Sequence, residues 1–171
     1  MFALGALCGA MCTLFALWLL SGLSAPLSLR VRVLALLAIA TIAVARDRGW
    51  VQITLPQAAR QIPREVLQRG PVRGAFQFGF ELGTCVRTFM TGSAPYVLAA
   101  AVLLLRPDPA LIVMAAAGVA VGRTLPLVQA MGADRERLFL DMTAAQRTLT
   151  SATAVLTLGC IVAVTLLLTR V

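Results

Sequence analysis

Residues 74–105 read GAFQFGFELGTCVRTFMTGSAPYVLAAAVLLL, a hydrophobic stretch with two charged side chains, Glu81 and Arg87. As one α-helix it would be about 48 Å long, whereas the hydrocarbon core of a bilayer is about 30 Å thick. Such a helix has to tilt, overhang or break. Pro95 lacks a backbone donor and disfavours helix at the residue before it. We therefore predict a break between Gly92 and Pro95, either within one span or as a re-entrant hairpin.

The whole chain has the composition of a membrane protein. Of its 171 residues, 60% are apolar and 13% are charged, and the mean hydropathy is +0.90. A soluble domain has about 45–50% apolar and about 25% charged residues. A membrane-spanning helix needs about 20 apolar residues, so this chain can supply roughly five spans. Because the apolar runs are continuous, we predict an all-α fold, a polytopic helical membrane bundle.

The hydrophobic runs fix the approximate limits of these spans. They form one predicted integral membrane domain, 1–171, with spans at about 1–20, 27–45, 74–105, 110–133 and 148–169. No basic residue precedes the first run, so we interpret it as a retained helix rather than a signal peptide. In the second span only residues 33–45 are free of charge, and we expect Arg30 and Arg32 to snorkel outward. Asp108 is the expected N-cap of the fourth span, with Pro109 as its first helical residue.

A basic loop separates the second span from the third. Residues 46–73 contain six arginines and two acidic residues. Because cytoplasmic loops carry an excess of basic residues, we predict that this loop and the N-terminus are cytoplasmic, in the inner membrane of a bacterium. Membrane-surface charge then accounts for most of the net charge of +8. We expect the lipid bilayer, and no nucleic acid, as the partner of this charge.

Two residue types are missing from the composition, histidine and lysine. Without histidine the chain lacks the commonest ligand of haem and zinc and the usual general base. Without lysine it cannot form a Schiff base. We therefore expect no metal and no cofactor, and the composition favours a role other than catalysis.

Apart from Arg30 and Arg32, three charged residues fall inside predicted spans: Glu81, Arg87 and Arg123. Each costs about 2.5–3.5 kcal/mol at a helix centre, so these side chains should face the bundle, a partner or a watery cavity. Glu81 and Arg123 lie about 10 and about 15 Å from the cytoplasmic ends of their helices, and we expect them to pair. The pair is either a structural ion pair or part of a substrate or proton site. In the second case Thr88 and Thr124 join the three charged residues in substrate binding.

An Arg-Thr pair precedes a helix-breaking proline twice in the chain. The first pair is 87–88 before Pro95, and the second is 123–124 before Pro126. Paired, proline-interrupted spans indicate a midplane binding site in transporters built from inverted repeats. Our leading hypothesis is therefore a small transporter-like protein with an intramembrane charged site. A non-catalytic membrane assembly or scaffold subunit is an alternative.

The four cysteines are Cys8, Cys12, Cys85 and Cys160, and no C-x-x-C motif occurs. Cys12, Cys85 and Cys160 have the same calculated depth, about 17 Å from the cytoplasmic side. Cysteine in a lipid span is commonly a small apolar filler. Three thiols at one depth also fit a redox site, in which these three cysteines would be the catalytic residues.

The run AFQFGFELGTC, residues 75–85, resembles the Phe/Gly-rich helix that leads to a membrane cysteine in the CcdA and DsbD thiol-relay family. That family passes reducing equivalents outward through two membrane cysteines in pseudo-symmetric halves. The resemblance implies a transmembrane thiol-disulfide electron relay that uses Cys85 with Cys12 or Cys160, and a thioredoxin-like partner. The prolines that the family places around its cysteine are absent here, and residues 118–126 contain no cysteine.

Small residues recur at four-residue spacing on two predicted spans. Gly5 and Gly9 form one such face, and Thr84, Thr88 and Gly92 form another. Faces of this kind let helix backbones approach closely in a membrane. We therefore expect a homo-oligomer or a partner membrane subunit.

We predict that Gln57→Cys, introduced into a cysteine-free chain, stays unmodified when an impermeant maleimide is applied to intact cells. The reason is the cytoplasmic location of the basic loop. The same cysteine should react once the cells are permeabilised, which is the control. Labelling of intact cells would reverse the orientation of every span.

Overall fold

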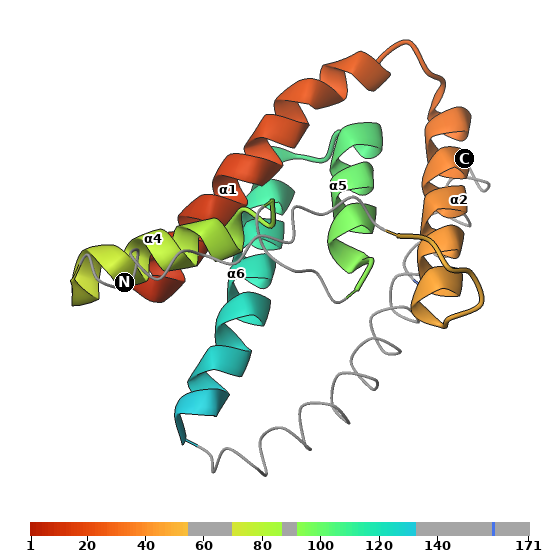
Figure 1. Cartoon of the computed structure of the whole chain (residues 1–171). Coiled ribbons are helices and arrows are strands. Elements are labelled where there is room, and N and C mark those ends of the chain that lie inside the picture. Colours follow the sequence, from red (N-terminus) through yellow and green to blue (C-terminus); the bar gives the residue numbers. More distant parts are fainter. Residues whose placement is uncertain (55–69, 87–91, 133–158, 160–171) are drawn as a thin grey trace. The chain divides into compact units, whose positions relative to one another are not determined.

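The computed structural model describes residues 1–54, 70–86, 92–132 and 159 (Figure 1). Every regular element in these ranges is a helix, which confirms the all-α class. The elements are α1 (Phe2–Leu20), the 3₁₀ helix η1 (Ser21–Ser24), α2 (Leu29–Asp47), α4 (Pro71–Gly83), α5 (Ala94–Leu105) and α6 (Pro109–Gly132). They form two compact units: α1, α4 and α6 belong to one, and η1, α2 and α5 to the other. The predicted span at 148–169 lies outside the described residues, apart from Gly159.

The start of α6 and the direction of the Arg32 side chain agree with what the sequence predicts. Asp108 caps α6 as predicted, because its Oδ1 accepts a hydrogen bond from the Ala110 N–H at 2.8 Å. Arg32 folds back along α2 and donates to the carbonyl groups of Leu27 at 2.8 Å and Ala25 at 2.9 Å. Its guanidinium therefore lies toward the N-terminal end of α2, as expected for a snorkelling arginine.

The third predicted span is not one helix. α4 ends at Gly83, and Cys85 has a left-handed φ of 56°, which a right-handed helix cannot contain. α5 begins at Ala94, with Pro95 in its first turn, where a proline needs no hydrogen-bond acceptor. The predicted break point therefore coincides with the start of α5, while α4 ends earlier than the sequence indicated.

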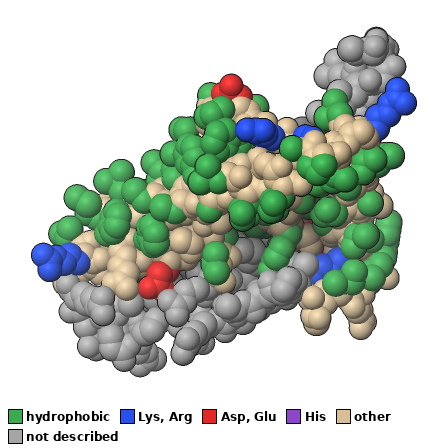
Figure 2. Space-filling model, turned by 90° about the horizontal axis from the view of Figure 1, so that it is seen from above, with side chains coloured by type: hydrophobic (Ala, Val, Ile, Leu, Met, Phe, Trp, Pro, Cys, Tyr) green, Lys and Arg blue, Asp and Glu red, His purple; other side chains and the backbone are tan. Residues whose placement is uncertain are grey.

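One helical segment among the described residues, Phe2–Ser24, is long and apolar enough to cross a membrane. Only 28% of its most apolar 18-residue window is buried, so it does not resemble the buried core helix of a soluble protein. α5 and residues Pro109–Leu125 are also apolar but shorter. Figure 2 shows hydrophobic side chains spread over the viewed face of the described helices. These features support association with a membrane.

Helices α1 and α4 pack with their backbones in contact. The residues at the contact are Gly5 and Gly9 of α1 and Gly79 and Gly83 of α4, here called the contact glycines. A Cβ atom on any of them would collide with a main-chain carbonyl oxygen of the other helix, at Phe76, Phe80, Phe2 and Ala6 respectively. A carbonyl group cannot turn away as a flexible side chain can, so only glycine fits at these positions.

The contacts also show that α1 and α4 are parallel. Residue numbers increase together along both helices through the contact glycines. Further along, the Thr13 Oγ1 donates a hydrogen bond to the Thr84 carbonyl at 3.0 Å. Near the other end, the rings of Phe2 and Phe78 lie 5.6 Å apart. The start of α4 is therefore beside the start of α1, and the intervening chain returns to that side.

Helix α6 packs antiparallel on α1. Near the end of α1, the Trp18 Nε1 donates to the Pro107 carbonyl at 2.9 Å, directly before α6 begins. From there α6 runs back along α1 and buries Ile112, Ala116 and Ala120, which recur every four residues on one helix face.

The Gly5 and Gly9 face has a different partner from the one expected. We assigned this face to contacts between subunits, but α4 of the same chain covers it. The Gly5 and Gly9 face therefore no longer supports the expectation of an oligomer.

The second unit is an antiparallel pair of helices. Leu36, Ala40 and Val97 form its buried core. At one end, the Ser24 Oγ before α2 donates to the Leu103 carbonyl of α5 at 2.9 Å. At the other end, the last residue of α2 binds the residue before α5, as described below.

We predict that Gly9→Ala lowers the free energy of unfolding by about 1–3 kcal/mol, because the new methyl group pushes against the Phe80 carbonyl. In a chain of this size that corresponds to about 2–4 °C in Tm for each kcal/mol, measured by thermal unfolding in detergent.

The matched control is Gly118→Ala on α6. Gly118 is exposed, and no described atom lies within 4 Å of a Cβ built there. We expect an unchanged or slightly higher Tm, because alanine favours helix over glycine by about 1 kcal/mol. Equal Tm values for the two variants would contradict the role of the contact glycines.

Candidate functional site

Cys85 and Arg123 meet where α4 ends, within the unit of α1, α4 and α6. The Arg123 Nη2 lies 3.5 Å from the Cys85 Sγ, and both side chains are half-buried. The antiparallel course of α6 brings Arg123 to this point, while Cys85 follows directly after the C-cap of α4. The contact therefore depends on where α4 stops.

The backbone at Cys85 is unusual. Its φ of 56° is left-handed, and its N–H donates to the Leu82 carbonyl at 3.4 Å. The Cys85 thiol also faces the Leu82 carbonyl, at 3.8 Å. A left-handed conformation costs a residue other than glycine about 1–3 kcal/mol, and such residues cluster at functional sites. This geometry supports Cys85 as part of a candidate site.

Glu81 does not pair with Arg123. The Glu81 Oε1 accepts a hydrogen bond from the Gln77 Nε2 one turn earlier on α4, at 3.2 Å. In the part of the chain that the structure describes, the ion pair is Arg46–Asp47, and none joins Glu81 to Arg123. The expected pair was inferred from depth, which gives the height of a group but not the direction of its side chain.

Two of the remaining predicted site residues, Thr124 and Cys12, lie within the described part of the chain. The Thr124 hydroxyl donates to the Val121 carbonyl of its own helix at 3.1 Å. Cys12 is a free, exposed thiol, as is Cys8. Arg87, Thr88 and Cys160 lie outside the described residues. Over the described ranges, no group of three or more His, Cys, Asp and Glu residues could hold a metal ion.

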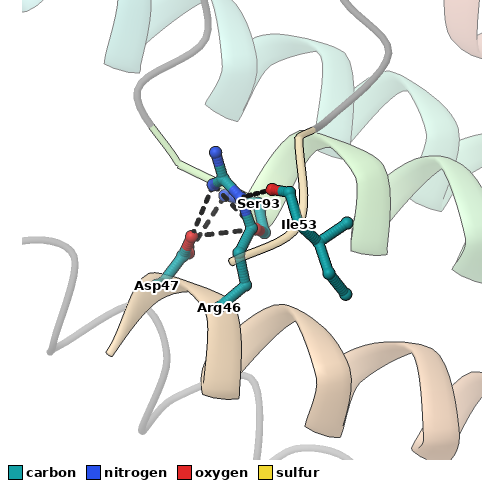
Figure 3. Close-up of polar contacts among 4 residues, drawn as sticks. All are labelled: Arg46, Asp47, Ile53 and Ser93. Atoms are coloured by element: carbon teal, nitrogen blue, oxygen red, sulfur yellow. Dashed lines mark hydrogen bonds and ion pairs between the residues drawn. The ribbon is translucent and has the colours of Figure 1, made fainter. Parts of the chain in front are cut away.

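A second polar cluster joins the end of α2 to the start of α5 (Figure 3). The Asp47 Oδ2 accepts the Ser93 N–H at 3.0 Å, and the Oδ1 accepts the Ser93 hydroxyl at 2.8 Å. Arg46 donates to the Asp47 Oδ1 at 2.9 Å, to the Ser93 Oγ at 3.3 Å and to the Ile53 carbonyl at 3.0 Å. We call these four residues the Asp47 cluster.

The Asp47 cluster caps α5 from another helix. The Asp47 carboxylate lies at the N-terminus of α5, where the helix macrodipole favours negative charge. The Asp47 side chain is only 10% exposed, yet both of its oxygens are hydrogen-bonded. In the sequence Asp47 is one of the two acidic residues of the basic loop. The Ser93 and Pro95 pattern indicates a helix start that needs an acceptor, but Asp47 lies 46 residues away.

We predict that Asp47→Asn lowers the free energy of unfolding by about 1.5–3 kcal/mol, because its hydrogen bonds involve a buried charge. Asp108→Asn is the matched control, since Asp108 also caps a helix but is exposed. We expect a change of about 0–0.5 kcal/mol there, because asparagine caps as well as aspartate. Chemical denaturation in detergent measures both, and equal losses would assign the Asp47 effect to ordinary capping.

No protein-family model, curated protein or solved structure matches this chain. Neither a fold family nor a relative's activity therefore bears on this geometry.

Proposed function

We propose that this chain is a small, multi-pass, transporter-like protein of the bacterial inner membrane with an anion-binding site at Arg123. The observation that carries the proposal is the 3.5 Å contact between the Arg123 guanidinium and the Cys85 thiol at the end of α4.

The thiol is a poor partner for this guanidinium. An arginine inside an apolar helix costs about 2.5–3.5 kcal/mol in a membrane. Sulfur is a weak acceptor, and among the described residues no acidic side chain forms an ion pair with Arg123. A carboxylate or phosphate group would supply the charge and could accept two parallel N–H bonds. Arg123 is therefore suited to bind an anionic substrate group, which would displace or lie beside Cys85.

The course of the chain supports the same proposal. α4 stops at Gly83, and interrupted helices form the binding sites of many transporters. The second expected interruption, at Pro126, was wrong, because α6 continues as one helix to Gly132. Since α1 and α4 are parallel, the chain between them has to return to its starting side. If α1 crosses the bilayer, this return requires a second crossing, which supports a multi-pass arrangement.

A thiol-disulfide electron relay is the second candidate, and the same contact favours it. Reactive cysteines occur in electropositive, partly exposed surroundings, and Cys85 is half-buried beside a guanidinium. A relay also needs a second thiol within about 4.4–6.8 Å between Cα atoms. Cys12 or Cys160 would have to supply it, and a thioredoxin-like protein would be the partner.

We predict that at least one of acetate, sulfate and phosphate raises the Tm of the purified protein in detergent. An anion at about 100 times its Kd adds ~2.7 kcal/mol, which is several degrees in a chain of this size. Arg123→Gln should lose the shift. Arg73→Gln is the matched control, because Arg73 is an exposed arginine in the first turn of α4. Uptake of the stabilising anion into proteoliposomes then tests transport.

Two further outcomes separate the candidates. Under the transporter proposal Cys85→Ala keeps the anion-dependent shift, because the thiol only neighbours Arg123. Under the relay hypothesis mild oxidation of the wild type joins Cys85 to a second cysteine, and Cys85→Ser abolishes thiol exchange. A shift that survives in Arg123→Gln would contradict the anion site.

A further inference from the structure

The chain leaves α2 through a hydrogen-bonded turn. The Gly49 N–H donates to the Arg46 carbonyl and the Trp50 N–H to the Ala45 carbonyl, both at 2.9 Å. Gly49 has a left-handed φ of 76°. This pair of bonds around a left-handed glycine is the Schellman motif, which fixes the backbone of the residue after the glycine. The position of Trp50 is therefore set by hydrogen bonds.

The side chains in this turn point outward. In a Schellman motif the residue after the glycine commonly packs back on the last helical turn. Trp50 is instead 76% exposed, and Val51 and Ile53 are each 42% exposed. The Arg46 Nε holds the far end of the segment by its 3.0 Å bond to the Ile53 carbonyl. Residues 50–53 thus form an ordered, hydrogen-bonded loop that displays apolar side chains.

Positive charge lies beside this apolar surface. Arg48 is exposed and precedes Trp50 by two residues, whereas Arg46 is engaged with Asp47. The preceding helix α2 also has exposed apolar side chains at four-residue intervals, at Leu34, Ala38 and Ile42. Exposed apolar side chains next to a tryptophan and an arginine are typical of the boundary between the bilayer core and the headgroups.

We infer that residues 48–53 are an interfacial anchor, in which Trp50, Val51 and Ile53 enter the headgroup region and Arg48 binds anionic phospholipid headgroups. The inference rests on the membrane location in the proposed function. Charge selects the partner, since loop 46–73 has six arginines and two acidic residues and the cytoplasmic leaflet carries anionic lipids.

The two tryptophans of the chain, Trp18 and Trp50, make the anchor measurable. The full-length wild type and Trp50→Phe are reconstituted into vesicles of phosphatidylcholine and phosphatidylglycerol, and the difference in emission is that of Trp50. We expect lipids brominated near the headgroup to quench Trp50 more than lipids brominated at mid-chain. Brominated phosphatidylglycerol should quench it more than brominated phosphatidylcholine.

Arg48→Gln should reduce the preference of Trp50 for phosphatidylglycerol by about fivefold. Arg106→Gln is the matched control, because Arg106 is exposed and follows α5 at the end of the helix pair away from Trp50. It should leave the preference unchanged. Equal quenching by the two lipid classes in the wild type would overturn the anionic headgroup as the ligand.

Trp18 separates failure of this inference from failure of the proposed function. Its emission is what remains in Trp50→Phe. If brominated lipid quenches Trp18 but not Trp50, the chain is in the membrane and the anchor is wrong. If neither tryptophan is quenched by lipid, the membrane location is wrong as well.

Discussion

The approach of α1 to α4 is possible only because the contact glycines have no side chains. Close van der Waals packing of the two backbones stabilises the pair. At this separation the Thr13 hydroxyl reaches the Thr84 carbonyl, which accepts its hydrogen bond at the end of α4. Cys85 is the next residue, and α6 packs on the same α1. The glycine packing and the course of α6 along α1 therefore both contribute to the position of the contact between Cys85 and Arg123.

Glycine spacing in the sequence predicted that helices would approach closely but not which helices. Gly5 and Gly9 pair with two glycines of α4 that have the same spacing. Gly118 and Gly122 of α6 share that spacing as well, yet both are exposed. A motif of this kind makes a helix face competent for contact, whereas the partner depends on the course of the whole chain. Helix ends were more predictable, because a cap such as Asp108 acts on its own neighbours.

The candidate site was predictable in its residues and not in its pairing. Hydropathy identified Arg123 as a charge in an apolar helix, and its calculated depth of about 15 Å was closer to that of Cys85, about 17 Å, than to that of Glu81, about 10 Å. Depth is one coordinate, so it could not show that the chain turns after Gly83 and presents the thiol instead of the carboxylate. The Asp47 cluster was missed for a related reason, since its partners lie 46 residues apart in the chain.

The two polar contacts differ in how completely the charge is satisfied, and that difference separates structure from function. Asp47 is almost fully buried, but it accepts three hydrogen bonds, one of them from the adjacent guanidinium of Arg46. A ligand has no missing hydrogen bond or charge to supply there. The role of the Asp47 cluster is therefore structural: it holds α2 to α5. Arg123 has up to five N–H donors, and the contact that the structure describes for it is with the sulfur atom of Cys85. A half-buried charge with so weak a partner among the described residues is costly to maintain in an apolar helix. The cost is explained if an anion completes the set, so Arg123 rather than Asp47 is the residue on which a function should be sought.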